Sequence, residues 1–468
     1  VTNYIALEVG SFPLTWILPL ALYLGSFIVT FRTGGGVPRS LRNAWPEILL
    51  AGLLMFLLGP VHWLAIIGHL AVFFLVCLVA HGTLYELRPP ASRLTNFYLA
   101  AALGGWIGGA LISLGAPFLF SALYEYPIIV LLLAPTFWWC REKPLTRLRT
   151  GVSYAAAVGR AVLVAFLVFL IVKEGWQTLQ EPVRFRHRNF YGTYTIWDVA
   201  AHPHDVRQLL HGRTIHGAQL LDPEERLTPI MYYFIGGGIA DVYETTPPVR
   251  RMAVLGLGAG AAASYVKPGE TMVFYEIDPD NEGIARHWFS FLGESKGDVR
   301  VIVGDGRLAM QNSDRREPPY DIIHMDAFTG DGIPTHLLTR EAVQIYLERL
   351  KDDGVILFHV SNRYYELRPV IKAIAARLGL AGAINVPTPK TQLKANQSAT
   401  WCVVLARDPE RLTALLRRGW IPLGPGDGLK DVAPWTDDYI NIMLPLRDGM
   451  RERWDGFDFA GWLKSLRP

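Results

Sequence analysis

A run of 33 consecutive residues, 48–80, contains no Asp, Glu, Lys or Arg. As a single helix this run would be about 50 Å long, because an α-helix rises about 1.5 Å per residue. A helix needs only about 20 apolar residues to cross a bilayer. Gly59 and Pro60 interrupt the run near its middle. We therefore predict two membrane-spanning helices in this stretch.

The same apolar pattern recurs elsewhere before residue 174. Further spans are predicted at residues 14–31, 97–123, 126–140 and 155–172, which makes six in total. Charged residues make up 19% of the chain, against about 25% in globular proteins, and the deficit lies almost entirely in this part. Residues 1–174 are therefore predicted to form a transmembrane helical domain in contact with the lipid bilayer.

Small and charged residues inside the predicted spans bear on helix packing and on the transport functions that this domain could have. Gly104, Gly105, Gly108 and Gly109 form a small-residue face, which in lipid lets two helices pack closely. Arg160 lies inside the sixth span, where a charge costs about 2.5–3.5 kcal/mol, so we expect it to snorkel or to have a partner. No predicted span carries an acidic residue, so a proton relay or a cation transporter is not indicated.

Charge and cysteine content exclude further classes of site. The formal net charge of +3 lacks the basic excess of a nucleic-acid-binding protein, so no nucleic-acid partner is expected. Cys77, Cys140 and Cys402 have no metal-ligand spacing. We therefore expect neither a metal site nor a disulfide framework.

After residue 174 the pattern changes to short strands and helices. Residues 175–250 are predicted to form a small β-rich bridging segment. Residues 251–408 alternate strand and helix, which indicates a mostly parallel sheet covered by helices, a Rossmann-like domain. Residues 409–468 are predicted to be a C-terminal extension that packs on this domain.

Glycines and acidic residues follow four of the predicted strands. The first strand runs into Gly256, Gly258 and Gly260, the second ends at Glu276, the third precedes Asp305 and Gly306, and the fourth precedes Asp326. Ligands of open α/β sheets bind beyond the carboxyl ends of the strands. A glycine turn lets the backbone approach a ligand, and an acidic residue about 20 positions later accepts ribose hydroxyls. We therefore predict a nucleoside site, although Asp326 is also placed to cap the loop that follows it.

The kind of nucleoside follows from the glycine spacing. NAD sites usually show G-x-G-x-x-G, whereas this turn reads G-x-G-x-G. The chain also has no G-x-x-x-x-G-K-[ST] loop, which excludes a P-loop nucleotidase. The pattern is typical of the class I S-adenosylmethionine-binding fold.

The chain resembles the spermidine synthase (polyamine aminopropyltransferase) family, and in particular its membrane-fused branch. In the apolar half the resemblance rests on residues 10–16, 81–82, 94–98 and 104–105. In the other half it rests on residues 216–219, 229, 232–233, 254–260, 275–279, 304–305, 326–328, 336–339 and 436–439.

The resemblance implies a set of roles for individual residues. Gln219 would lie over the cofactor, Glu276 would hold the ribose, and Asp305 would bind the adenine. Asp326 matches the first Asp of the family's D-x-x-D motif and would be the catalytic residue. The co-substrate would be decarboxylated S-adenosylmethionine, or S-adenosylmethionine itself. An amine would attack the carbon beside its sulfonium and release methylthioadenosine.

Two acidic contacts of the family are missing or moved in this chain. The fourth position of D-x-x-D is Thr329, and Asp331 follows two residues later. The family's tyrosine-histidine-glutamate motif reads Tyr232, Tyr233 and a phenylalanine. We predict that both tyrosines and Asp331 line the amine pocket, with core packing as the alternative for the tyrosines. Asp437 would add negative charge there, with helix capping as its alternative role.

Three functions are compatible with these features. The first is aminopropyl transfer to a small amine by a membrane-anchored enzyme, the interpretation we favour. The second is a non-catalytic ligand-binding or structural subunit of a complex with other membrane proteins, which the altered acidic motif favours. The third is methyl transfer from S-adenosylmethionine, although no Arg or Lys in the motif loops is placed to bind its carboxylate.

The distribution of basic residues bears on location. Lys and Arg follow the first, third and fifth predicted spans but not the second or fourth, so the former loops are predicted to be cytoplasmic. Six spans then place the C-terminal domain on the opposite face, whereas adenosyl cofactors are made in the cytosol. We expect an integral protein of a bacterial inner membrane. A re-entrant segment would put the domain in the cytoplasm, and both orientations stay open.

Overall fold

The computed structural model divides into two compact units, Val1–Thr195 and Ile196–Pro468. It describes residues 1–9, 13–59, 63–140, 154–179, 183–200, 204–212, 214–328, 332, 334–362, 365–387, 389, 392–394, 396–446 and 448. The boundary between the units falls inside the predicted bridging segment.

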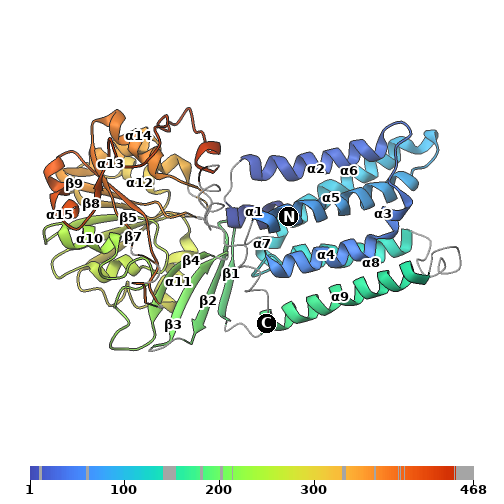
Figure 1. The fold of residues 1–468 in the computed structure, drawn as a ribbon, viewed down its shortest axis with the longest axis horizontal. Helices are drawn as coiled ribbons and strands as arrows, with labels where there is room; N and C mark the ends of the chain where they lie inside the picture. The colour runs from blue at the N-terminus through green and yellow to red at the C-terminus, as the bar shows by residue number, and fades with distance from the viewer. Residues whose placement is uncertain are drawn as a thin grey trace. The chain divides into compact units, whose positions relative to one another are not determined.

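The first unit is helical where the apolar runs predict spans (Figure 1). Its elements are α1 (Thr2–Val9), α2 (Pro13–Phe31), α3 (Arg39–Asn43), α4 (Trp45–Leu58), α5 (Trp63–Glu86), η1 (Ala91–Arg93), α6 (Leu94–Ala110), η2 (Leu111–Gly115), α7 (Ala116–Leu119), α8 (Glu125–Cys140), α9 (Tyr154–Leu179) and the strand β1 (Val183–Arg188). The predicted break holds, because α4 ends one residue before Gly59, whose φ is 70°. The predicted separation of the spans at residues 97–123 and 126–140 also holds, since α7 ends at Leu119 and α8 begins at Glu125.

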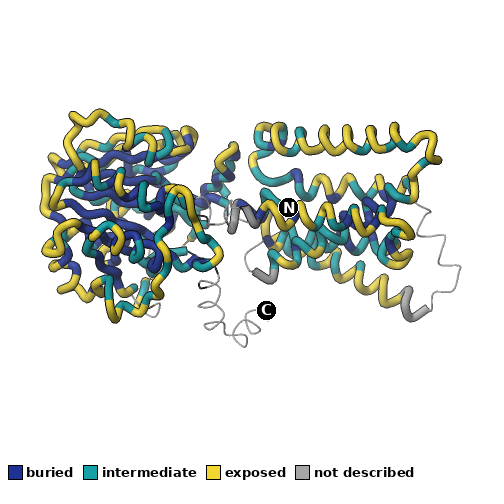
Figure 2. The backbone as a smooth tube through the Cα atoms, turned by 90° about the horizontal axis from the view of Figure 1, so that it is seen from above, coloured by how far each residue is buried: buried dark blue, intermediate teal, exposed yellow. Residues whose placement is uncertain are grey.

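Two stretches among the described residues are long and apolar enough to cross a membrane. They are Ala65–Glu86 and Ala91–Leu119, and three further apolar helices are shorter. Only two of the six predicted spans therefore meet this criterion of length and composition. Much of the helical unit is exposed (Figure 2). Trp106 is 71% exposed and Trp139 is 89% exposed. Large apolar side chains in such a position are suited to lipid rather than to water.

Two arginines of the helical unit have acidic partners, whereas the glycines of α6 lack the close packing that we expected. Arg160 pairs with Glu47 and donates to the Asn43 carbonyl oxygen at 2.7 Å, which supplies the expected partner. Arg188 forms a buried ion pair with Glu125, with nitrogen–oxygen distances of 2.7 and 2.8 Å. Around the four glycines of α6, in contrast, no described atom lies within 4 Å of the place that a Cβ would occupy, so the expected close packing is not made within the described residues.

The second unit begins within β2 (Thr193–Val199) and continues into the antiparallel pair β3 (Val206–His211) and β4 (Thr214–Leu220). An eight-stranded sheet follows, in the order β12-β10-β11-β9-β8-β5-β6-β7. Its strands are β5 (Arg251–Leu255), β6 (Thr271–Glu276), β7 (Asp298–Val303), β8 (Tyr320–Met325), β9 (Leu350–His359), β10 (Ala381–Ile384), β11 (Cys402–Ala406) and β12 (Ile421–Pro422). The strands β5 to β9 are mutually parallel, whereas β10 to β12 pair antiparallel.

Helices alternate with these strands, as the sequence predicts. They are α10 (Gly238–Thr245), η4 (Ala261–Tyr265), α11 (Pro279–Trp288), α12 (Gly306–Asn312), η5 (Thr335–Leu337), α13 (Arg340–Arg349), α14 (Arg368–Leu378), η7 (Pro409–Leu412) and α15 (Thr413–Arg417). The central strands β5 and β8 are almost fully buried, because a parallel sheet is covered on both faces. The parallel alignment brings the carboxyl ends of β5, β6, β8 and β9 to one edge of the sheet (Figure 1).

A buried ion pair lies at the start of two of these strands. Arg250 precedes β5 and Glu270 precedes β6, and their side chains are 2% and 1% exposed. Two nitrogen–oxygen contacts of 2.8 Å join the guanidinium to the carboxylate. The pair lies at the amino ends of the strands, away from the edge where ligands of such sheets bind, so we assign it a structural role.

We expect Glu270→Gln to destabilise the protein by about 3–5 kcal/mol, because Arg250 is left buried without its counter-charge. Chemical unfolding of the purified protein in detergent measures this loss. Glu348→Gln is the matched control, since Glu348 pairs with Arg315 on the surface at 3.5 Å, and its effect should stay within about 0.5 kcal/mol. Equal effects of the two substitutions would contradict a stabilising role for the buried pair.

Candidate active site

The glycine turn after β5 is closely surrounded by other backbone segments. Gly256, Gly258 and Gly260 have φ values of 98°, 52° and 79°, a region that L side chains rarely adopt. A Cβ on Gly256 would clash with the backbone oxygen of Asp326, and one on Gly258 would clash with that of His216. Only glycine therefore fits at these two positions, and the turn lies directly against the end of β8.

Glu276 lies at the end of β6, beside the glycine turn. It is 7% exposed and accepts hydrogen bonds from the backbone nitrogens of Leu257 at 3.0 Å and Asp278 at 2.9 Å. Burial raises the pKa of the Glu276 carboxyl, although these hydrogen bonds oppose the shift. The carboxylate is thus held in a fixed orientation at the position predicted for ribose binding.

Asn281 is a further polar residue at this position that the sequence analysis missed. Its side-chain nitrogen donates to Glu276 at 3.0 Å and to the Gly258 carbonyl oxygen at 3.3 Å. Its side-chain oxygen is buried and has no hydrogen-bond partner among the described residues. A buried acceptor without a donor is costly, and a ligand hydroxyl group would satisfy it. The position of Asn281 in α11, five residues after Glu276, is the sequence feature that could have indicated it.

Asp305 and Gly306 lie at the start of α12. Asp305 caps this helix by accepting from the Leu308 backbone nitrogen at 2.9 Å, and its other oxygen is 2.8 Å from Nε2 of His336. Burial raises the pKa of the Asp305 carboxyl, but the hydrogen bonds from Leu308 and His336 outweigh this, so that pKa is lowered. A Cβ on Gly306 would lie 2.9 Å from a side-chain methyl group of Leu255, so a larger residue there would require this side chain to shift.

Two exposed apolar side chains adjoin these acidic residues. Ile277 follows Glu276 and is 46% exposed, and Leu308 is 55% exposed. Exposed branched side chains beside the buried carboxylate of Glu276 and the partly buried one of Asp305 form an amphipathic surface, which suits a planar base with a sugar attached.

Gln219 lies in β4 and is 3% exposed. Its side-chain nitrogen donates to the Arg226 carbonyl oxygen at 3.0 Å, and its oxygen accepts from the Ser290 backbone nitrogen at 3.2 Å. Both ends of the amide therefore have protein partners. Cofactor contact by Gln219 remains a prediction.

Asp326 is buried at the end of β8, where two side chains bind its carboxylate. Tyr233 donates a hydrogen bond to Oδ2, and Nδ1 of His359 lies 2.6 Å from Oδ1. Burial raises the pKa of the Asp326 carboxyl, but the charge and hydrogen bond of His359 outweigh burial, so that pKa is lowered. Burial raises the pKa of Tyr233 well above its usual value, and the negative charge of Asp326 raises it further.

His359 is the second residue that the sequence analysis missed. It is the last residue of β9, beside the end of β8 in the parallel register, which places it at the edge where the other polar residues gather. The ring of Tyr232 lies 4.8 Å from its ring, and that of Phe328 lies 5.1 Å away. Tyr232 also donates to the His216 carbonyl oxygen at 3.2 Å. Both predicted tyrosines thus lie beside Asp326 and His359.

His324 lies two residues before Asp326 in β8 and is fully buried. Its Nδ1 is 3.1 Å from the Tyr243 hydroxyl, whereas its Nε2 has no partner among the described residues. Burial lowers the pKa of His324 to about 4, which keeps the ring neutral at pH 7. His324 is therefore a buried core histidine with a hydrogen-bond partner at one ring nitrogen among the described residues.

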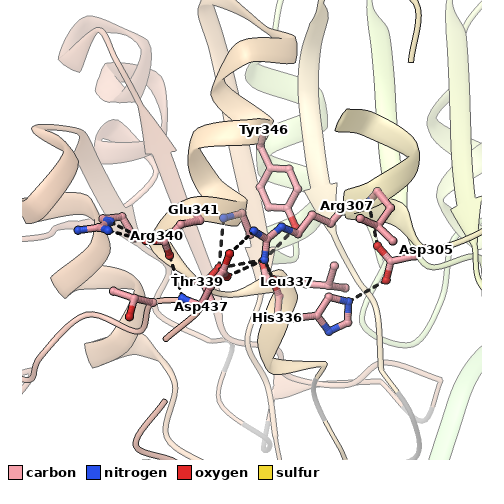
Figure 3. Close-up of polar contacts among 12 residues, drawn as sticks. Asp305, Arg307, His336, Leu337, Thr339, Arg340, Glu341, Tyr346 and Asp437 are labelled. Carbon is pink, nitrogen blue, oxygen red and sulfur yellow. Dashed lines mark hydrogen bonds and ion pairs between the residues drawn. The ribbon is translucent and has the colours of Figure 1, made fainter. Parts of the chain in front are cut away.

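Asp437 is part of a polar network that extends to Asp305 (Figure 3). Arg307 donates to the His336 carbonyl oxygen at 2.9 Å, and the His336 ring binds Asp305 at 2.8 Å. The Asp437 carboxylate accepts from Arg307 at 2.7 and 2.5 Å and from the Thr339 hydroxyl at 2.8 Å. The hydrogen bonds and charge of Arg307 lower the pKa of Asp437. Since Thr339 caps α13, the network fastens the C-terminal segment to two helices. The amine contact predicted for Asp437 remains a prediction, and Asp331 and Thr329 lie outside the described residues.

If Asp437 serves mainly to bind Arg307, Asp437→Asn and Arg307→Gln should destabilise the protein non-additively, with a coupling energy of about 0.2–1 kcal/mol. Unfolding of both single variants and the double variant measures this energy. An amine KM that rises in Asp437→Asn but not in Arg307→Gln would instead place Asp437 against the substrate.

No cluster of three or more His, Cys, Asp or Glu suited to a metal ion occurs among the described residues. The metal-free site remains a prediction. The glycine cradle and the unpartnered oxygen of Asn281 do fit a nucleoside.

The strand order, with an antiparallel β11 inserted beside parallel β9, defines a class I S-adenosylmethionine-binding Rossmann-like domain. Within that class, the chain is similar over part of its length to a polyamine aminopropyltransferase. It is 30% identical over 159 residues to the polyamine aminopropyltransferase of Vibrio vulnificus (strain CMCP6), a match that covers 33% of this chain and 52% of the relative. The chain thus spans about half the length of this relative.

Other similarities are more limited. The chain is 34% identical over 112 residues to the N-terminal histidine N-methyltransferase of Emericella nidulans, which covers 23% of this chain and 19% of that protein. A probable spermidine synthase from Corynebacterium glutamicum aligns with a TM-score of 0.41 and 14% identity, over 56% of this chain and 99% of that structure. No protein-family model matches the chain.

Proposed function

We propose that this protein is a membrane-anchored aminopropyltransferase. It transfers the aminopropyl group of decarboxylated S-adenosylmethionine to an amine and releases methylthioadenosine. The observation that carries the proposal is the position of Asp326, a buried carboxylate whose backbone lies against the Gly256 turn. That position puts a negative charge next to the predicted nucleoside site.

The nucleoside half of the site has a consistent chemistry. Glu276 accepts the ribose hydroxyls, and the free oxygen of Asn281 accepts a further ligand hydroxyl. Asp305 is assigned to the exocyclic amine of adenine, and Ile277 and Leu308 cover the base. The similarity to an aminopropyltransferase over 159 residues supports this assignment.

The amine half of the site centres on Asp326. A primary amine is an ammonium at pH 7, and an ammonium has no lone pair for attack. A buried carboxylate attracts the cation, and the groups around it remove one proton. The free amine then attacks the carbon beside the sulfonium, the carbon–sulfur bond breaks, and sulfur keeps the electron pair. Tyr232, Tyr233 and Phe328 surround the reacting groups with aromatic surface.

The membrane part of the proposal rests on the helical unit. The two long apolar stretches and the exposed aromatic side chains support anchoring in a bilayer, which we assign to a bacterial inner membrane. The use of a cytosolic co-substrate favours a cytoplasmic C-terminal domain.

Calorimetric titration of the purified full chain tests the proposed function. Decarboxylated S-adenosylmethionine, S-adenosylmethionine and methylthioadenosine are titrated separately. Tighter binding of the decarboxylated form is expected. Preference for S-adenosylmethionine would favour methyl transfer instead, and binding of none of the three would favour a non-catalytic subunit of a membrane complex.

A further inference from the structure

Asp326 and His359 form a closely spaced buried pair at the carboxyl edge of the sheet. The parallel register of β8 with β9 sets Met325 opposite Phe358, so the two residues that follow are neighbours. Both side chains are 8% exposed, and Nδ1 of His359 lies 2.6 Å from Oδ1 of Asp326. The imidazole ring therefore has one nitrogen committed to the carboxylate.

The packing around His359 holds its ring in one orientation. The Tyr232 ring lies 4.8 Å away at an interplanar angle of 33°, and the Phe328 ring lies 5.1 Å away at 66°. With Nδ1 facing Asp326, the second nitrogen, Nε2, points away from the carboxylate. A carboxylate beside one nitrogen stabilises the tautomer with the proton on that nitrogen and leaves a lone pair on the other.

Asp326 is less well suited to accept a proton. Tyr233 donates to one of its oxygens, and the hydrogen bond with His359 involves the other. Both carboxylate oxygens are thus already engaged in hydrogen bonds that stabilise the ionised form, which makes Asp326 a weaker base. A neutral imidazole, in contrast, keeps a nitrogen lone pair that can accept a proton.

We propose that His359 is the proton acceptor for the substrate amine, through Nε2, and that Asp326 is its positioning residue. This inference rests on the proposed function and assigns the base within it. Nothing in the family motif of the sequence points to His359, because it lies on a different strand from the D-x-x-D segment.

The proton balance of the step is simple. Nε2 takes one proton from the ammonium, which gives an imidazolium and a neutral amine. The amine nitrogen forms a bond to the aminopropyl carbon, the bond from that carbon to sulfur breaks, and the sulfur becomes a neutral thioether. The product is a secondary ammonium, and the imidazolium returns its proton to solvent. One proton is released per turnover.

Several titratable groups face His359. Asp326 binds it from β8, and His324 on the same strand adds a second imidazole nearby. Tyr232 stacks on its ring, and Cys402 lies opposite it in the β11 register. Burial raises the pKa values of Tyr232 and Cys402, so both are neutral at pH 7. Asp326 is therefore the charged partner of His359 among these groups.

The first test compares His359→Gln with wild type in aminopropyl transfer across pH. We expect kcat/KM at pH 7 to fall about 10²–10⁴-fold, while methylthioadenosine binding is retained. The deficit should shrink as pH rises toward the pKa of the amine, since the free amine then needs no base. His287→Gln, at an exposed position of α11, is the control. A deficit that is independent of pH, or near-wild-type activity of His359→Gln, would overturn the proposal.

A second measurement does not depend on turnover. Selective ¹⁵N-histidine labelling, with His359→Gln for assignment, reports which ring nitrogen carries the proton. We expect the proton on Nδ1 in wild type and loss of this preference in Asp326→Asn. An active wild type with its proton on Nε2 would overturn the role of His359 alone. A wild type that turns over no amine would instead overturn the proposed function, and with it this role.

Discussion

Glu276→Gln is expected to weaken binding of methylthioadenosine about 10²–10⁴-fold. Hydrogen bonds to a charged acceptor contribute about 1.5–3 kcal/mol each, and two ribose hydroxyls supply two such bonds. The loss of about 3–6 kcal/mol corresponds to this range, at 1.4 kcal/mol per factor of ten. The amide nitrogen of Gln would also face donors, because the backbone nitrogens of Leu257 and Asp278 point at this group. Isothermal titration calorimetry measures the change.

Glu282→Gln is the matched control for this substitution. Glu282 lies on the same segment but pairs with Arg286 on the surface of α11 at 2.9 Å, so binding should be unchanged. Thermal unfolding checks that both variants are folded. A folded Glu276→Gln variant with wild-type affinity would contradict the ribose assignment.

The pH dependence of binding gives the same test in wild-type protein. Burial raises the pKa of Glu276, and only the ionised carboxylate accepts both hydroxyls well. Affinity should therefore be full above this raised pKa and decline as the pH falls through it. In Glu276→Gln this decline should disappear.

Asp326→Asn is expected to lower aminopropyl transfer about 10²–10⁴-fold, the usual contribution of a positioned acid–base group. The substitution removes the charge that attracts the ammonium and the acceptor that orients His359. Methylthioadenosine binding should change little, because the contacts that we propose for the ribose and the adenine come from the ends of other strands. Steady-state kinetics and calorimetry on the same preparation separate the two effects.

Asp352→Asn is the control for Asp326→Asn, since its side chain is fully exposed. If the two variants had equal activity, Asp326 would serve only to cap the loop after β8. If Asp326→Asn lost nucleoside binding as well, its main contribution would be to the structure of the glycine turn that it touches.

The Rossmann-like sheet could be predicted because its strands are short, apolar and separated by periodic helices. The residues at the ends of β5, β6 and β8 follow from the same rule, since parallel strands deliver their carboxyl ends to one edge. Their side-chain contacts did not follow, because hydrogen bonds such as that of Tyr233 to Asp326 join segments about 90 residues apart in sequence.

Two site residues were missed for a related reason. His359 ends an apolar strand and looks like a buried histidine in isolation, so its role emerges only from the β8–β9 register. Asn281 lies in a helix outside the glycine turn, and its contact with Glu276 depends on where α11 packs. Knowing which strands are neighbours would have identified His359. Identifying Asn281 also requires knowing where α11 packs on the sheet.

In the helical unit, the positions of the helices were easier to predict than the number of membrane spans. Apolar runs predicted the long helices α2, α4, α5, α6, α8 and α9, because composition determines which segments avoid water. The short helices α1 and α3 match no predicted span. The number of spans was less predictable, since helix length depends on where a turn such as Gly59 interrupts the run. Of the six predicted spans, two satisfy length and composition among the described residues.

The most direct test of the proposed function is product formation by the purified full chain. The protein is incubated with decarboxylated S-adenosylmethionine and a panel of primary amines, and methylthioadenosine is quantified by chromatography. We predict methylthioadenosine that depends on an added amine and on Asp326, with an aminopropylated amine formed in equal amount. Absence of methylthioadenosine with every amine, or formation of S-adenosylhomocysteine from S-adenosylmethionine instead, would contradict aminopropyl transfer.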